Sequence, residues 1–348
     1  MSAPPLKLPS WATANAAGLH GNTAPGRIRL IDLALSLLQV PEFIPPQTLS
    51  KDTLSKEIKA VFKKAAPGEA IVIDVGVGDD PSTTVELALA LTSTTQIIGT
   101  EVDGERLANS EKILAAQKSR VQLRLGTTDF TLPQVAPSLV RAMNVLRDYP
   151  VPESIAALRK LYWQVKRGGL LVEGSAETEG RVAVAMVMQR GEEEEEDEVE
   201  LPIDAVIFAA DLDAIAKEEG YADAAPASWF NRHNHLPRLV RGFCTEVECK
   251  GGDEPAWVTP MRTFLERWEA QAGGGEAQAG RGDPGDPNRG TVRERFVRGA
   301  RGMEAGEEEG TVVAEWADRG ILVWLPGGAF VVPDVEEWDY YRQRVKIT

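Results

Sequence analysis

One stretch of the sequence decides the fold: Ile71-Val72-Ile73-Asp74-Val75-Gly76-Val77-Gly78-Asp79-Asp80-Pro81-Ser82-Thr83-Thr84-Val85-Glu86-Leu87. It begins as a short apolar run, which is typical of a strand buried on both faces. The run breaks at two glycines, and apolar residues then return at helical spacing. Asp80 is a good N-cap, and Pro81 suits the first helical turn because its missing N–H costs nothing there. A strand, a glycine turn and a helix together predict a cradle for a nucleotide-type ligand.

The chemistry of this turn separates two classes of cofactor. A dinucleotide site has a third glycine and a helix N-terminus that is open to the pyrophosphate. Here Pro81 stands at the third glycine position. Asp79 and Asp80 lie where the diphosphate would sit, and their charges would repel it. A ligand that carries an ammonium and a sulfonium group tolerates these acidic surroundings, so the turn disfavours a nicotinamide-dependent reductase.

The pattern Asp74-x-Gly76-x-Gly78 resembles the first motif of the class I S-adenosylmethionine-dependent methyltransferases. The resemblance implies an α/β, Rossmann-like, doubly wound and mostly parallel sheet with helices on both faces. It also implies that Asp74, Gly76 and Gly78 bind S-adenosylmethionine. The alternative is a strand-helix turn that holds no ligand.

The next strand is predicted at Gln96 to Asp103 and ends in acidic residues. Glu101 follows Gly76 at close to the ~20-residue spacing that places a carboxylate on a ribose. A carboxylate suits that position because it accepts hydrogen bonds from both hydroxyls. We favour Glu101 over Asp103 as the ribose ligand, although the register between them stays open, and we expect Asp103 to cap the following helix.

Two further groups of site residues follow later strands. After a third strand at Val121 to Leu125, Asp129 and Phe130 resemble the loop in which the methyltransferases hold the adenine amino group and ring. A fourth strand is predicted at 138–149, with a polar end. Open α/β sheets bind ligands beyond the carboxyl ends of their strands. Asn144, Arg147 and Tyr149 are therefore candidate catalytic residues, with a polar strand end that contacts no substrate as the alternative. The Asn-Pro-Pro-Tyr signature of amino-group methylases is absent.

The following segments extend the resemblance. A helix is predicted at 150–166, and Gly168 and Gly169 separate it from a strand at 170–174. With Asn144 to Tyr149 and a further strand at 182–188, this run resembles a little-characterised bacterial-type group of class I methyltransferases.

The remainder of the chain suggests one domain with additions. Residues 1–25 form a predicted flexible arm, and residues 26–348 form the methyltransferase-like domain. Insertions are expected at 190–200, which is acidic, and at 270–290, which is rich in Gly, Ala, Asp and Pro. A C-terminal extension with a hairpin turn at Gly327-Gly328 is expected to pack on this domain. The helix start Pro25 to Arg29 carries two cations, and is either a solvated helix start or a lid over the ligand.

Composition limits the partners of the protein. The chain has 348 residues and a net charge of -15, so a broad attraction to nucleic acid is not indicated. Cys244 and Cys249 make neither a disulfide framework nor a four-ligand zinc spacing, and we expect no metal. No apolar stretch is long enough for a membrane span, and no secretory signal begins the chain. We expect a cytoplasmic protein, with an organelle transit segment left open.

These features predict a methyltransferase that uses S-adenosylmethionine and transfers its methyl group to an unidentified nucleophile. A dedicated base is needed only when that nucleophile is protonated at neutral pH. A non-catalytic domain of the same fold that binds a ligand or a partner is the alternative, because fold alone does not fix function.

Overall fold

The structure is a computed structural model that describes residues 25–38, 40–43, 70–117, 119–133, 135–146, 149, 151–176, 180–191, 201, 204–211, 321–325 and 329–330. Several sequence predictions fall outside these residues. They are the arm 1–25 apart from its last residue, the insertion 270–290 and nearly all of 190–200. Arg147 and both cysteines also lie outside the described residues.

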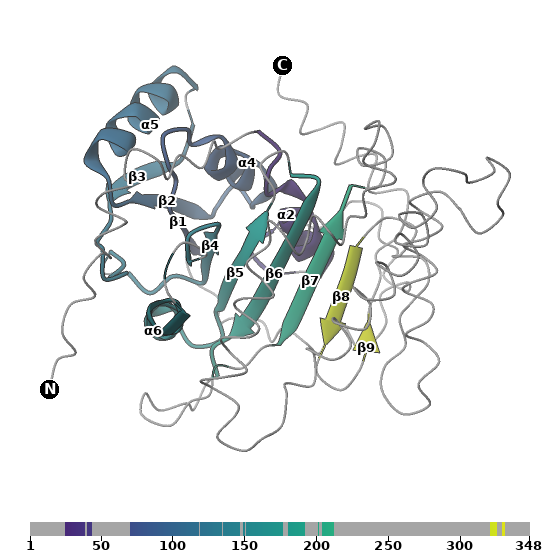
Figure 1. Cartoon of the computed structure of the whole chain (residues 1–348). Helices are drawn as coiled ribbons and strands as arrows, with labels where there is room; N and C mark the ends of the chain where they lie inside the picture. Colours follow the sequence, from purple (N-terminus) through teal and green to yellow (C-terminus); the bar gives the residue numbers. More distant parts are fainter. Residues whose placement is uncertain are drawn as a thin grey trace, which may run out of the picture.

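A nine-stranded sheet organises the molecule, in the order β3-β2-β1-β4-β5-β6-β7-β8-β9 (Figure 1). Its first half is parallel. The strands of that half are β1 (Ile71–Val75), β2 (Gln96–Glu101), β3 (Gln122–Leu125), β4 (Leu139–Met143) and β5 (Leu170–Ala176). From β5 onward the sheet continues as an antiparallel series. Its strands are β6 (Val182–Gln189), β7 (Ala205–Ala210), β8 (Ile321–Leu325) and β9 (Ala329–Phe330).

Helices cover both faces of the sheet. The described helices are α2 (Arg29–Leu37), α4 (Ser82–Ala90), α5 (Gly104–Gln117) and α6 (Val151–Gln164). The connections β1-α4-β2 and β2-α5-β3 run toward one edge of the sheet, and β4-α6-β5 runs toward the other. Right-handed crossovers therefore place α6 on the face opposite α4 and α5. Helix α2 contacts α4, β6 and β7, and Figure 1 shows it behind those strands.

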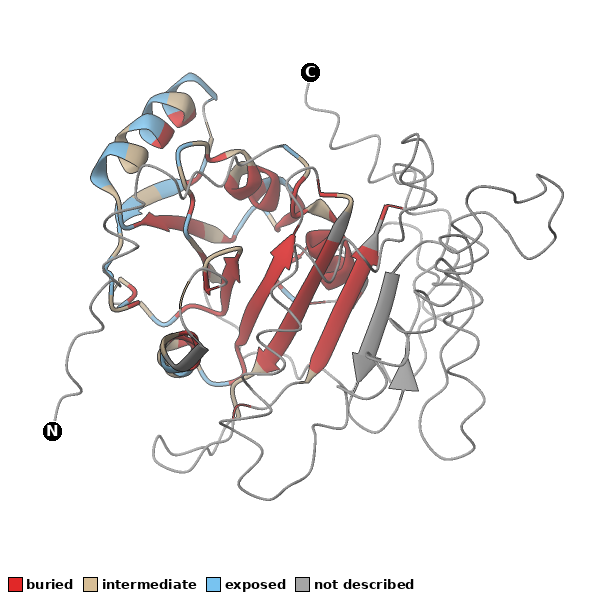
Figure 2. Ribbon diagram, in the orientation of Figure 1, coloured by how far each residue is buried: buried red, intermediate tan, exposed pale blue. Residues whose placement is uncertain are grey.

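An apolar core lies between the sheet and helices α2 and α4, and Figure 2 shows the central strands buried. The core on the α4 side of the sheet contains buried residues of α2 and α4, Leu114 of α5 and alternate residues of the strands. None of its described members lies on α6. On β5 these residues are Leu170, Val172 and Ala176. Because side chains alternate across a strand, the intervening residues Leu171, Glu173 and Ser175 face α6.

The predicted fold class is confirmed, with more antiparallel pairing than the sequence suggested. Strand β6 follows β5 directly, as predicted, and β8 pairs with β9 in the antiparallel arrangement that the predicted hairpin requires. Strand β4 ends at Met143, well short of the predicted 149. The reason is Asn144, whose φ of 62° lies in the left-handed region and turns the chain out of the sheet.

Candidate functional site

The glycine loop between β1 and α4 is tightly held. The N–H groups of Gly76 and Val77 both donate to the carbonyl of Thr100, at 2.8 and 3.1 Å. Gly76 and Gly78 have φ of 80° and 79°, which residues with a Cβ rarely adopt. A Cβ on Gly76 would also lie 2.6 Å from Cγ2 of Val145. Both glycines are therefore required by the backbone, and the loop passes close to the segment that follows β4.

Glu101 lies against this loop. Its Oε2 accepts the N–H of Gly78 at 2.8 Å, and its Oε1 accepts the N–H of Asp103 at 3.0 Å. The side chain is buried. Asp103 instead accepts the N–H groups of Glu105 and Arg106, at 2.8 and 3.2 Å, which confirms the predicted cap of α5. Of the two acids, only Glu101 has its carboxylate bonded to the glycine loop.

The acidic residues of the loop are placed close to expectation. Helix α4 begins at Ser82 with Pro81 in the N-cap position, one residue later than predicted. Asp80 still receives the first helical N–H, that of Ser82, at 2.9 Å. Among the described ion pairs, Asp79 is paired with Arg106, whose Nε lies 3.9 Å from Oδ2 of Asp79. Negative charge therefore borders the start of α4, where a dinucleotide site would hold a diphosphate.

Asp74 does not reach the loop, because a buried ion-pair network holds its side chain. Arg141 of β4 donates from Nε and Nη2 to the two oxygens of Asp74, at 2.9 and 2.8 Å. Its Nη1 lies 2.7 Å from both oxygens of Asp32 on α2, and Thr84 donates to Asp74 at 2.6 Å. Asp74 therefore fixes β1 against α2, α4 and β4, and acts on the site by positioning the strand that leads to Gly76.

This network is closed to solvent, so burial and the neighbouring charges together set the pKa values of its members. Arg141 is fully buried. Burial opposes its charge, but Asp32 and Asp74 more than compensate and raise the pKa of Arg141. Burial also raises the pKa of Asp32, in spite of its contact with Arg141. A buried charge is tolerated only with partners of this kind.

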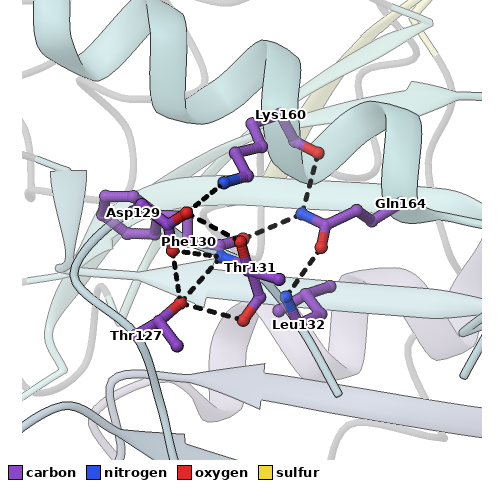
Figure 3. Close-up of polar contacts among 7 residues, drawn as sticks. All are labelled: Thr127, Asp129, Phe130, Thr131, Leu132, Lys160 and Gln164. Atoms are coloured by element: carbon purple, nitrogen blue, oxygen red, sulfur yellow. Dashed lines mark hydrogen bonds and ion pairs between the residues drawn. The ribbon is translucent and has the colours of Figure 1, made fainter. Parts of the chain in front are cut away.

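The loop after β3 contains the predicted adenine residues. Figure 3 shows Asp129 bonded to Lys160 of α6 at 2.6 Å. Thr127 donates to Oδ1 of Asp129, and Thr131 donates to both oxygens, so each oxygen already accepts two hydrogen bonds. The bonds from Lys160 and Thr127 hold the pKa of Asp129 well below its usual range. An adenine amino group would have to replace one of these donors.

Phe130 and Tyr149 lie together although they come from different loops. Their rings contact edge to face with centroids 5.4 Å apart. Phe130 has a φ of 58°, and Gln164 of α6 donates to its carbonyl at 2.8 Å (Figure 3). The structure thus joins a predicted adenine residue to a predicted catalytic residue, on the side of the site next to α6.

Asn144 lies at the carboxyl end of β4, as predicted, and its amide ties that end to β5. Its N–H donates to the carbonyl of Gly174 at 2.8 Å. Its Oδ1 accepts the N–H of Ala176 at 2.8 Å and the hydroxyl of Ser175 at 3.2 Å. The amide oxygen of Asn144 therefore ties the end of β4 to β5.

The start of α2 lies across the carboxyl ends of β5 and β7. Arg27 donates to the carbonyl of Ala176 at 3.1 Å, and Arg29 pairs with Asp211 at 2.7 Å. The N–H of Gly26 donates to Glu86 at 2.6 Å, and burial raises the pKa of that carboxyl to about 7. Arg27 is 5% exposed, so the interpretation of this segment as a solvated helix start is wrong at that residue.

The charged residues that support the candidate site were not predicted from the sequence. Arg141 stands within an otherwise apolar strand, and Asp32 within an apolar helix. A charge at a position predicted to be buried indicates that a partner exists, but the spacing does not show which one. Lys160 carried no signal, because an exposed lysine on a helix is common.

No family model matches the chain, and no curated protein matches it. Solved structures match it in part. A methyltransferase from Clostridium acetobutylicum that depends on S-adenosylmethionine is 9% identical, with 57% of this chain and 71% of that chain covered and a TM-score of 0.31. PKMT2 from Rickettsia typhi, in complex with AdoHcy, is 16% identical over 30% of this chain and 21% of its own, with a TM-score of 0.27. The [4+2]-cyclase SpnF is 23% identical over 31% of this chain and 39% of its own, with a TM-score of 0.27.

The part of the chain that the structure describes contains no group of three or more His, Cys, Asp or Glu residues that could hold a metal ion. Within the same residues, no helix has the length and apolar character needed to cross a membrane.

Proposed function

We propose that this protein is an S-adenosylmethionine-dependent methyltransferase whose methyl acceptor is unidentified. The observation that carries the proposal is the pairing of a left-handed glycine loop with Glu101. Gly78 donates its N–H to the carboxylate of Glu101, the last residue of the neighbouring strand β2, so the loop and the acid form one unit at the carboxyl edge of the sheet. Ligands of open α/β sheets bind at that edge.

The residues of this unit suit an adenosyl ligand that carries positive charge. A carboxylate has about four acceptor positions, and the N–H groups of Gly78 and Asp103 use two of those on Glu101. The remaining positions suit two ribose hydroxyls. Asp79 and Asp80 favour an ammonium or sulfonium and disfavour a diphosphate. Gly76 and Gly78 allow the backbone to approach the ligand closely.

Each remaining predicted residue has a narrower proposed role. Phe130 offers an apolar ring for the adenine, and Asp129 takes the adenine amino group in exchange for one of its present donors. Asn144 holds the end of β4 against β5 on the acceptor side. Tyr149 borders that side through its contact with Phe130. Arg147 stays a predicted acceptor-side residue.

Methyl transfer places few demands on these groups. When bound, S-adenosylmethionine supplies a methyl on a positively charged sulfur that is activated toward nucleophiles. The protein must hold an acceptor in line with that methyl and exclude water, and much of the rate follows from such positioning. Any base serves only to remove a proton from the acceptor.

Calorimetry with two ligands tests the proposal. S-adenosylhomocysteine should bind the full chain with one site, and NADH should give no heat of binding under the same conditions. S-adenosylhomocysteine is a better probe than S-adenosylmethionine because it is stable and carries no methyl group to transfer. Binding of NADH without binding of S-adenosylhomocysteine would refute the proposal and restore the reductase alternative.

A further inference from the structure

Glu173 of β5 is a buried carboxyl without a partner. Its residue is 1% exposed, and neither carboxylate oxygen has a hydrogen-bond partner. Among the described residues, only Glu173 has two buried side-chain oxygens that both lack a hydrogen-bond partner. Burial raises the pKa of Glu173 to about 8. A buried carboxyl without a hydrogen-bond partner destabilises the fold, so packing alone does not explain its presence.

The strand register places Glu173 beside the proposed cofactor site. Asp74 pairs with Arg141, and Arg141 pairs with Val172, so Glu173 is level with Val75, the last residue of β1 before the glycine loop. Two strand spacings, roughly 10 Å, separate β5 from β1. The next residue, Gly174, accepts the N–H of Asn144. The carboxyl therefore lies just below the acceptor-side edge and close to its centre.

The neighbours of Glu173 do not explain its presence. On the adjacent strands it lies opposite Ala142 and Met186, which offer no polar side chain. On its own strand, Ser175 shares its face but donates its hydroxyl to Asn144. The charged residues of α6, the helix on that face, are Glu153, Arg159 and Lys160. Arg159 is exposed, and Lys160 is paired with Asp129. The pKa of Glu173 is raised by burial.

We propose that Glu173 is the proton-accepting residue of the acceptor side, so that the acceptor is an amine or hydroxyl group. This inference rests on the proposed function. As the acceptor nitrogen or oxygen bonds to the methyl carbon, the sulfur–methyl bond breaks and its electron pair stays on sulfur. The proton of the acceptor N–H or O–H moves to a carboxylate oxygen of Glu173 and later passes to solvent. A group that titrates near neutral pH suits this task.

Proton release on cofactor binding tests the placement of Glu173 without knowledge of the acceptor. A base that touches the acceptor atom would lie within about 7 Å of the sulfonium, which at an effective dielectric constant of about 20 would lower the pKa of the carboxyl by about one to two units. At pH 7 a group with a pKa near 8 would then release roughly 0.4–0.8 proton per bound S-adenosylmethionine. S-adenosylhomocysteine, which has an uncharged sulfur, should release none from this group. Calorimetry in two buffers of different ionisation enthalpy measures the difference.

Two variants assign the proton to its source. Glu173→Gln keeps the shape of the side chain and should abolish the additional release with S-adenosylmethionine, and Glu173→Met provides the same test if the glutamine variant does not fold. Glu86→Gln is the matched control, because it removes a second buried carboxyl, whose pKa burial raises to about 7, and it should leave the release unchanged.

The outcomes separate the two proposals. If S-adenosylmethionine binds with no additional proton release, or with equal release from Glu173→Gln, Glu173 does not face the sulfonium and this inference is overturned. Release that is lost in Glu86→Gln would assign the proton to the opposite face and overturn it as well. If neither S-adenosyl ligand binds, the proposed function itself fails.

Discussion

Replacement of Glu101 tests the ribose contact quantitatively. Hydrogen bonds to a charged group contribute ~1.5–3 kcal/mol each, and about 1.4 kcal/mol changes a dissociation constant tenfold. Glu101→Ala removes the proposed acceptors of both ribose hydroxyls and leaves the N–H of Gly78 without its carboxylate partner. We therefore expect the affinity for S-adenosylhomocysteine to fall by at least about tenfold. Glu101→Gln should lose less, because one acceptor oxygen survives.

Asp103→Ala is the matched control for this series. Asp103 caps α5, so its loss should lower the free energy of unfolding by about 1 kcal/mol and leave the affinity nearly unchanged. Calorimetry at one salt concentration gives the three affinities, and thermal unfolding shows that each variant is folded. A large loss of affinity for Asp103→Ala with none for Glu101→Ala would refute the assignment of the ribose site.

Three further predictions concern the support of the site. Arg141→Met leaves two buried aspartates uncompensated, so denaturant unfolding should show a loss of about 3–5 kcal/mol. Burial raises the pKa of Glu86 to about 7, so Glu86 binds its proton more tightly in the folded state than in the unfolded state. The free energy of unfolding should therefore fall as pH rises from about 4.5 through 7. Glu86→Gln should flatten that part of the curve of stability against pH. Lys160→Met frees an acceptor position on Asp129 and should tighten binding of S-adenosylhomocysteine severalfold in calorimetry, whereas Asp129→Ala should weaken it; equal affinities would exclude a role of Asp129 in binding adenine.

The parallel half of the fold could be predicted because its signals are local. Strands β1, β4 and β5 are short and mostly apolar, and a turn or a helix pattern follows each of the strands from β1 to β4. The cap at Asp103 was predicted correctly, because this acid directly precedes a helix pattern, whereas Glu101 stays the predicted ribose ligand. The antiparallel extension was harder to predict. Pairing between β7 and β8 joins residues separated by more than a hundred positions, and sequence spacing does not encode such contacts.

The interior of the site could not be predicted for a related reason. Asp74 carries the motif pattern, but a buried arginine from β4 binds its side chain. A pattern indicates where a residue lies along the chain and does not show which distant charge will neutralise it. Glu173 illustrates the same limit, because its burial and its missing partners follow from β4, β6 and α6 together.

Hydrogen exchange of the full chain with and without S-adenosylhomocysteine tests the location of the site most directly. Ligand binding at the carboxyl edge should slow amide exchange in peptides that cover Gly76 to Ser82 and Glu101 to Arg106, because those N–H groups lie in the glycine loop and at the start of α5. Peptides from β7, which lies far along the sheet, should be unchanged. Saturating ligand that binds but leaves both loop peptides unprotected would contradict the account.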